Sequence, residues 1–208
     1  MIAIIDYGVG NLFSLYSSFK AIGYEAIVTG DPETIRKADK LTLPGVGAFR
    51  DAARKLRDSG LFDLVKEQAS SGKPIMGICL GMQMLFERSY EYGVYDGLGL
   101  IPGEIRPIAE VIPEGLKIPQ IGWNGLLLSE NSSPIFRDIH DRDCVYFVHS
   151  YQAVCDDRYI IARTEYGHEL TAAVQHNNVF GCQFHPEKSG KVGLRILKAF
   201  CEMEAVSC

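Results

Sequence analysis

Short apolar runs alternate with amphipathic stretches through the first half of the chain. Ile2–Ile5 is wholly apolar, as is typical of a strand covered on both faces. Residues 12–22 then carry apolar side chains at helical spacing, and Gly23 follows as a helix stop. The same alternation predicts further strands at 25–28, 40–43 and 74–78, and helices at about 48–58, 61–71 and 80–88. Asp31-Pro32 has the residues of a helix start, with Asp as N-cap.

The pattern changes after residue 100, where strands predominate. We expect strands at 125–129, 145–151, 160–165 and 172–183, the last of them folded into a hairpin at Asn177-Asn178 because Asn tolerates positive φ. Ser189 is placed to cap a final helix. Strand–helix alternation predicts parallel strands joined by right-handed crossovers. The fold class is therefore α/β, with an open, mostly parallel central sheet, flanking helices and a β-rich C-terminal half, in one domain spanning 1–208.

Composition excludes several classes of protein. Apolar residues make up 47% of the 208 and charged residues 23%, both ordinary for a globular chain, and the net charge of −5 argues against binding a phosphate backbone. The most apolar uncharged run, residues 74–86, is shorter than the roughly 18 residues of a membrane span. The N-terminus has no basic segment of a signal peptide, so we expect a cytoplasmic protein that acts on neither membranes nor nucleic acid. Six cysteines without CxxC spacing favour neither a disulfide framework nor a zinc site, and we expect no metal and no cofactor.

One segment has the pattern of a nucleophile elbow. Gly77-Ile78-Cys79-Leu80-Gly81 joins the predicted strand 74–78 to a helix, with Cys79 where many hydrolases have Ser. A sharp strand-to-helix turn needs small residues on both sides of the nucleophile. It also places the sulfur at a helix N-terminus, which favours thiolate, and leaves the Leu80 N–H for an oxyanion. On these five residues alone, an ordinary glycine-rich turn with a packed cysteine is an equal interpretation.

His185-Pro186-Glu187 supplies the partners that a thiolate nucleophile needs. His185 and Glu187 are two residues apart, so in an extended segment both side chains point to the same side. Pro186 favours extended backbone at His185, and Glu187 can then fix the imidazole tautomer. A structural histidine beside a surface glutamate is the alternative for this tripeptide taken alone. With the elbow on the same α/β chain, the joint interpretation is a Cys–His–Glu triad.

Two other glycine turns follow predicted strands. Gly8-Val9-Gly10 lacks the third glycine of a dinucleotide loop, because position 13 is Phe. Val46 and Gly47 lie at the end of the predicted strand 40–43, where open parallel sheets bind ligands, and can lend a second oxyanion N–H.

These segments together identify a family resemblance. The run from Gly77 to Gln83 with His185-Pro186-Glu187 resembles the class I glutamine amidotransferases, and further segments carry the similarity over residues 2 to about 200. The resemblance implies a flavodoxin-like fold and a glutaminase in which Cys79 attacks the glutamine amide, while His185, oriented by Glu187, moves the protons. It also implies the residues that bind substrate and oxyanion, which are Val46, Gly47, Leu80, Gln83, Glu91, His149, Ser150 and Tyr151.

The segments around Asn11, Trp123 and Tyr146 resemble the members of the family that form a heterodimer with a (β/α)₈-barrel cyclase. The resemblance implies that ammonia passes through the partner for histidine biosynthesis, and that Asn11, Trp123, Tyr146 and Lys188 lie at the docking face. Three alternatives stay open on the residues. They are a related amidotransferase serving a different acceptor, as in surface-sugar synthesis; a nucleotide-binding module with a structural Cys79; and a cysteine hydrolase that needs no partner.

Overall fold

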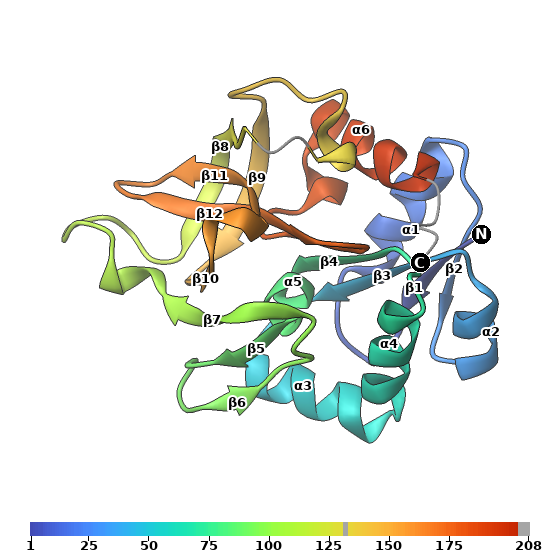
Figure 1. Ribbon diagram of the computed structural model, residues 1–208. Coiled ribbons are helices and arrows are strands. Elements are labelled where there is room, and N and C mark those ends of the chain that lie inside the picture. Colours follow the sequence, from blue (N-terminus) through green and yellow to red (C-terminus); the bar gives the residue numbers. More distant parts are fainter. Residues whose placement is uncertain (131–132, 204–208) are drawn as a thin grey trace.

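A nine-stranded mixed sheet lies at the centre of the molecule, in the order β2-β1-β3-β4-β13-β12-β11-β8-β9 (Figure 1). The computed structural model describes residues 1–130 and 133–203. The first five strands in this order pair in parallel and the rest pair antiparallel. The predicted α/β class is confirmed, and the antiparallel strands come from the C-terminal half.

The bounds of the parallel strands are close to the predicted ones, whereas those of the antiparallel strands differ more from the prediction. The parallel strands are β1 (Ile2–Ile5), β2 (Ala26–Thr29), β3 (Lys40–Gly45), β4 (Ile75–Cys79) and β13 (Val179–Cys182). The antiparallel strands are β12 (Glu169–His176), β11 (Ile160–Glu165), β8 (Gln120–Leu128) and β9 (Cys144–His149). The predicted hairpin joins β12 to β13, and Asn177 has a φ of 53° there.

Helices cover both faces of the parallel half, as Figure 1 shows. The helices are α1 (Leu12–Ala21), α2 (Pro32–Lys37), α3 (Phe49–Asp58), α4 (Leu61–Ser70) and α6 (Gly190–Glu202). Ile2 and Ile4 belong to a core with α1 and α6, whereas Ala3 and Ile5 belong to a second core with α2, α3 and α4. Alternate residues of β1 are therefore buried on opposite faces, which explains why the strand is apolar throughout.

A second, four-stranded sheet was not predicted. It has the order β10 (Tyr151–Val154), β7 (Ile101–Pro107), β5 (Phe86–Ser89) and β6 (Tyr95–Asp96). The helix expected over 80–88 was wrong in extent, because α5 ends at Met84 (Leu80–Met84). The N–H groups of residues 97–100 donate to the carbonyls of residues 84–87, so those carbonyls are withdrawn from helical bonding and Phe86 starts a strand instead.

The predictions for two helix caps and for the strand at 145–151 are confirmed only in part. Asp31 caps α2 by accepting from the Thr34 N–H at 2.8 Å, as predicted. Ser189 precedes α6 but does not cap it with its side chain, because its hydroxyl donates to the His185 carbonyl at 2.6 Å. The strand expected over 145–151 is interrupted at Ser150, where the chain passes from the large sheet to the small one. Short 3₁₀ turns occur at η1 (Ile108–Glu110), η2 (Pro134–Phe136), η3 (Asp157–Tyr159) and η4 (Pro186–Lys188).

Within residues 1–130 and 133–203, no helix has both the length and the apolar character needed to cross a bilayer. Cys208, one of the six cysteines considered above, lies outside the described residues.

Candidate active site

Cys79 sits in the strained turn that its neighbours predict. It ends β4 with φ 55° and ψ −113°, and Leu80 begins α5 directly after it. A Cβ on Gly81 would lie 1.8 Å from the Leu43 carbonyl oxygen, and one on Gly77 would lie 2.7 Å from the Gly81 carbonyl oxygen. No side chain fits at either position without moving the backbone. The turn therefore has the geometry of a nucleophile elbow, with the sulfur at the end of a central strand.

His185 and Glu187 form a buried pair. The His185 Nδ1 lies 2.7 Å from the Glu187 Oε1, and their side chains are 2% and 3% exposed. His185 is extended, as predicted, but Pro186–Lys188 turn into η4, so Glu187 reaches the ring through a turn rather than along a strand. Among the described residues, the His185 Nε2 has no hydrogen-bond partner. In a catalytic triad, an acidic residue holds the histidine at one ring nitrogen and leaves the other free for the nucleophile. His185 and Glu187 have this arrangement.

Two opposing effects act on the His185 pKa. Burial lowers it, whereas the neighbouring Cys79 and the hydrogen-bonded Glu187 carboxylate raise it. The effects of Cys79 and Glu187 prevail over burial and raise the pKa of His185 to about 9. At neutral pH the imidazole is therefore protonated beside the cysteine, so it is an acid ready to give up a proton.

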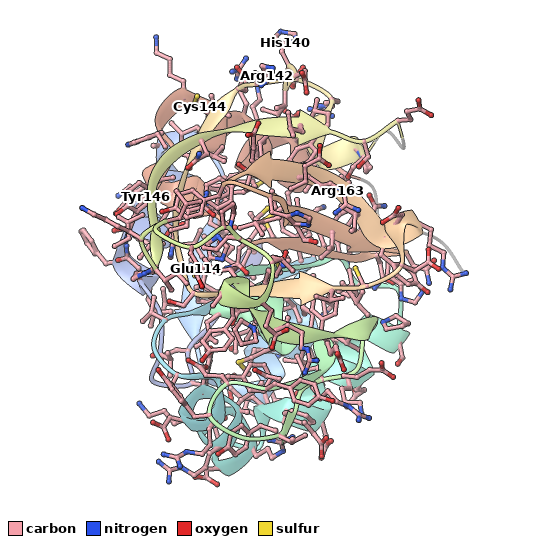
Figure 2. The ribbon with its side chains drawn as sticks, turned by 90° about the vertical axis from the view of Figure 1, so that its left-hand side faces the viewer. Glu114, His140, Arg142, Cys144, Tyr146 and Arg163 are labelled. Atoms are coloured by element: carbon pink, nitrogen blue, oxygen red, sulfur yellow. The ribbon has the colours of Figure 1, made fainter. Side chains whose placement is uncertain are left out.

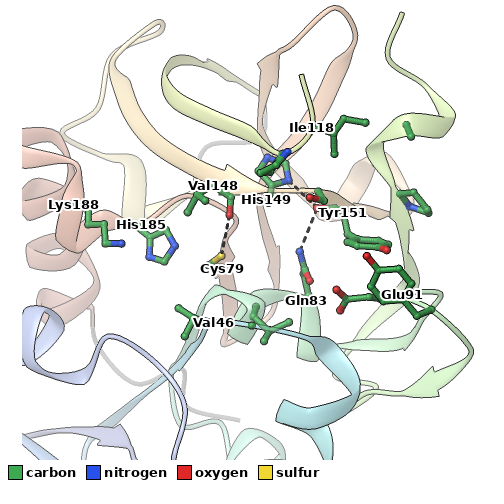
Figure 3. A pocket seen from close by; sticks show the side chains of 17 residues that line it. Val46, Cys79, Gln83, Glu91, Ile118, Val148, His149, Tyr151, His185 and Lys188 are labelled. Carbon is green, nitrogen blue, oxygen red and sulfur yellow. Dashed lines mark hydrogen bonds between the residues drawn. The ribbon is translucent and has the colours of Figure 1, made fainter. Parts of the chain in front are cut away.

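Strand register brings Cys79 and the segment that leads to His185 to one edge of the sheet. β4 and β13 are parallel neighbours, and Ile78 is paired with Cys182. Cys79 and Gln183 each follow this pair, so the segment that leads to His185 starts beside the elbow. The Cys79 Sγ also lies 3.9 Å from the Val148 carbonyl oxygen (Figure 3).

A cavity of about 690 Å³ opens at this edge, and both Cys79 and His185 line it (Figure 3). All eight residues expected to bind substrate and oxyanion line it as well: Val46, Gly47, Leu80, Gln83, Glu91, His149, Ser150 and Tyr151. Sequence reasoning missed six further lining residues: Tyr92, Pro107, Ala109, Ile118, Pro119 and Val148. Except for Val148, they come from the small sheet and its loops, and no motif marks those segments.

Glu91 connects the cavity to the segment that holds Val46 and Gly47. Its Oε2 accepts from the Phe49 N–H at 2.5 Å, at the first residue of α3. Burial raises the pKa of Glu91, and the hydrogen bond from Phe49 opposes that rise. The carboxylate is thus half-buried, at a helix N-terminus, and faces the cavity.

His149 is a neutral histidine in the same cavity. Burial lowers its pKa to about 4. Its Nδ1 lies 2.8 Å from the Tyr151 carbonyl oxygen, and its Nε2 lies 2.9 Å from the Gln120 side-chain amide. A carbonyl can only accept, so Nδ1 carries a proton and donates a hydrogen bond to the Tyr151 carbonyl. The two contacts of the His149 ring hold it between Gln120 of β8 and Tyr151 of β10.

Three of the four residues expected at a docking face, Trp123, Tyr146 and Lys188, form a partly exposed group. Trp123, the only tryptophan, is 56% exposed and packs edge-on against Tyr146, with ring centroids 5.9 Å apart. The Lys188 Nζ lies 5.8 Å from the centroid of the Tyr146 ring, and Tyr146 stands on the outer strand β9 (Figure 2). Asn11 precedes α1 and is half-buried. Because Lys188 also lines the cavity, this group borders the candidate active site.

The described residues contain no group of three His, Cys, Asp or Glu side chains arranged to hold a metal ion.

Comparisons with known proteins give the relatives of this chain. Residues 3–203 match the family model "Glutamine amidotransferase class-I". The chain is 50% identical over 202 residues to "Imidazole glycerol phosphate synthase subunit HisH" of Sulfurimonas denitrificans, covering 96% of this chain and 97% of that protein. It is 52% identical to the protein of the same name from Lactococcus lactis, covering 97% and 98%.

Solved structures share the fold at low sequence identity. A structure described as "Crystal structure of glutamine amidotransferase" superposes with a TM-score of 0.75 at 19% identity, covering 97% of this chain and 98% of the other. "Structure of PurLQS from Thermotoga maritima" superposes with a TM-score of 0.75 at 22% identity, covering 96% of both chains.

Proposed function

The chain belongs to the class I glutamine amidotransferase family and is a glutaminase of the kind found in imidazole glycerol phosphate synthase, and we propose that Cys79, His185 and Glu187 carry out its reaction. The observation that carries this proposal is the buried His185–Glu187 pair, whose free Nε2 shares a cavity with the Cys79 sulfur. The site lies in a single domain that we propose spans residues 1–208.

The first half-reaction transfers the acyl group to the enzyme. The Cys79 thiolate attacks the side-chain amide carbon of glutamine, and a C–S bond forms. The tetrahedral intermediate then expels ammonia as its C–N bond breaks, with the proton coming from the His185 Nε2. The elevated pKa of His185, about 9, supports this role because the ring holds that proton at neutral pH.

The second half-reaction releases glutamate. The neutral His185 takes a proton from water at Nε2, and the resulting hydroxide attacks the thioester carbon. The C–S bond breaks, glutamate leaves, and the thiolate and imidazolium are restored. Glu187 holds the ring by Nδ1 and stabilises the positive charge of the imidazolium.

Oxyanion stabilisation falls to two backbone segments. The Leu80 N–H is the first of α5, and the first N–H groups of a helix have no partner inside it. The second donor comes from the Val46–Gly47 segment, which lines the cavity and in which Gly47 has a φ of 90°. Loss of one such donor typically costs about 10²–10³ in rate, so the conformation of Val46–Gly47 is a strong determinant of activity.

We assign the recognition of glutamine to the Glu91 carboxylate and the side-chain oxygen of Gln83. Both N–H groups of Gln83 are used, one on the Tyr151 carbonyl at 3.2 Å and one on Gln183 at 3.0 Å. Its Oε1 is therefore left to accept from a ligand. The Glu91 carboxylate supplies the negative charge that suits the α-ammonium group of glutamine.

We propose that the partner is a (β/α)₈-barrel cyclase subunit that receives the ammonia for histidine biosynthesis, as the sequence resemblance implies. Asn11, Trp123, Tyr146 and Lys188 form its docking face, and the exposure of Trp123 supports this assignment because buried aromatic anchors dominate protein interfaces. A different acceptor, as in surface-sugar synthesis, is not favoured by the relatives at about 50% identity. The cytoplasmic location stays a prediction.

The test is glutamate release from glutamine by the purified chain, with and without the cyclase and its nucleotide ligand. We expect little activity alone, strong stimulation in the complex, and none with Cys79→Ala, which should still fold and bind the cyclase normally. Full turnover without a partner would instead indicate a free-standing hydrolase. Appreciable turnover by Cys79→Ala would refute the nucleophile assignment.

A further inference from the structure

Gln183 is buried beside the candidate nucleophile. It follows β13 directly, its side chain is fully buried, and its backbone N–H donates to the Ala172 carbonyl at 2.9 Å. The side-chain Nε2 lies 3.8 Å from the Cys79 Sγ. A buried amide costs free energy unless its donors and acceptor are used, so both ends of this side chain need a partner.

The direction of the hydrogen bonds around Gln183 is fixed by a backbone carbonyl. The Tyr151 carbonyl can only accept, so Gln83 must turn its NH₂ group toward it. The same NH₂ group lies 3.0 Å from Gln183, which must therefore present its oxygen there. The NH₂ group of Gln183 is then the end that faces the Cys79 sulfur. The chain of bonds from Tyr151 to Cys79 has one polarity only.

We propose that Gln183 stabilises the reactive thiolate by donating an N–H to the Cys79 sulfur, with Gln83 holding the amide in that orientation. This rests on the proposed function, because it assumes that Cys79 reacts as a thiolate. A hydrogen bond donated to a charged group favours the charged form. The helix N-terminus and the His185 imidazolium act on the same sulfur from other directions, and Gln183 adds a donor that is shielded from solvent.

The experiment measures Cys79 alkylation by iodoacetamide across a pH series, in the full chain without a partner. Peptide mass spectrometry distinguishes the label on Cys79 from label on Cys144, which is exposed and can be alkylated as well. Gln183→Met keeps the length of the side chain and removes the donor. Gln68→Met is the matched control, a buried glutamine on α4 away from the site.

In Gln183→Met, the midpoint of the alkylation profile should rise by about one pH unit, so the rate on the acid side falls about tenfold. Gln68→Met should leave the midpoint unchanged. An unchanged midpoint in a folded Gln183→Met protein would overturn the proposal, because a purely structural glutamine alters stability without altering the profile.

A measurement on the unmutated side chain covers the case in which Gln183→Met does not fold. The side-chain NH₂ resonance of Gln183 should shift across the same pH range as the alkylation profile, and Cys79→Ser should abolish that shift. A resonance that does not respond to pH would also overturn the proposal. A chain that shows these shifts but never releases glutamate with its cyclase would contradict the proposed function alone.

Discussion

Two histidines in one cavity hold opposite protonation states at neutral pH. Cys79 and Glu187 together outweigh the burial of His185 and raise its pKa to about 9. His149 is buried, its hydrogen-bond partners are neutral, and the charge of His185 further disfavours its protonation, so its pKa falls to about 4. The same side chain thus serves as an acid in one position and as a fixed structural group in the other, because their neighbours differ.

The elevated pKa of His185 predicts how acylation depends on pH. Thioester formation should fall as pH rises through about 9, where the ring loses the proton that ammonia needs. Glu187→Gln removes a negative charge that raises this pKa, so the fall should move to lower pH with a moderate loss of rate. His185→Ala should lose about 10²–10⁴ in rate. Single-turnover kinetics across pH tests this, and greater damage from Glu187→Gln than from His185→Ala would contradict the assigned roles.

The lowered pKa of His149 predicts acid sensitivity. The unfolded chain takes up a proton near pH 6.5, whereas the folded chain resists it down to about pH 4. The stabilisation is therefore complete above pH 6.5 and is lost as pH falls toward 4, by about 3 kcal/mol over that range. Urea unfolding at several pH values should show a smaller acid-side loss in His149→Asn than in the parent. His140→Asn, which changes an exposed histidine, serves as control.

At the scale of elements, the parallel half was predictable and the small sheet was not. Each parallel strand is an apolar run followed by a helix, so its sequence carries its own signal. β6 has only two residues, and β7 pairs with β10 across a long stretch of sequence. No local pattern reports such pairing.

The residues of the candidate site also divide into those that the sequence predicted and those that it did not. Cys79, His185 and Glu187 follow adjacent strands and carry motifs, so the sequence predicted them together. Gln183 was missed because its donor direction depends on Gln83 and Tyr151, which are distant in sequence. Tyr92 and Ile118 reach the cavity from loops whose path only the folded structure defines.

The tight turn at Cys79 predicts how one added methyl group at Gly81 changes the free energy of unfolding. In a helix, Gly→Ala ordinarily stabilises by about 1 kcal/mol. At Gly81 the new Cβ would lie 1.8 Å from the Leu43 carbonyl oxygen, so Gly81→Ala should destabilise by about 3 kcal/mol. Urea denaturation measures this. Gly125→Ala, whose Cβ would have 3.2 Å to its nearest atom, should cost much less, and equal costs would contradict the steric account.

At the scale of the whole molecule, the cavity opens beside an apolar surface that residues 1–130 and 133–203 leave exposed. Ile121 and Trp123 are 60% and 56% exposed, two residues apart on β8. Residues two apart on a strand share a face, so both project to the same side. Lys188 joins this surface to the cavity, which places any docked partner next to the site of ammonia release.

Trp123→Ala should weaken cyclase binding about 30-fold, the size expected for an interfacial aromatic anchor. Isothermal titration with the cyclase measures the dissociation constant. Ile27→Ala removes an exposed apolar side chain from β2, at the opposite edge of the sheet, and should leave binding unchanged. Unchanged affinity in Trp123→Ala would place the docking face elsewhere.

The pairing of β4 with β13 also governs when the chain becomes reactive during its synthesis. The two strands that carry the nucleophile and lead to the base are far apart in sequence, and the Cys79–Gln183 contact spans 104 positions. Contacts of such long range form slowly because a long loop must be closed. A nascent chain on the ribosome exposes its cysteine long before residues 179–187 exist, and it holds that cysteine without His185 and Glu187. We therefore expect hydrolysis of glutamine to begin only after β13 has entered the sheet, so the onset of activity would report this late step of folding.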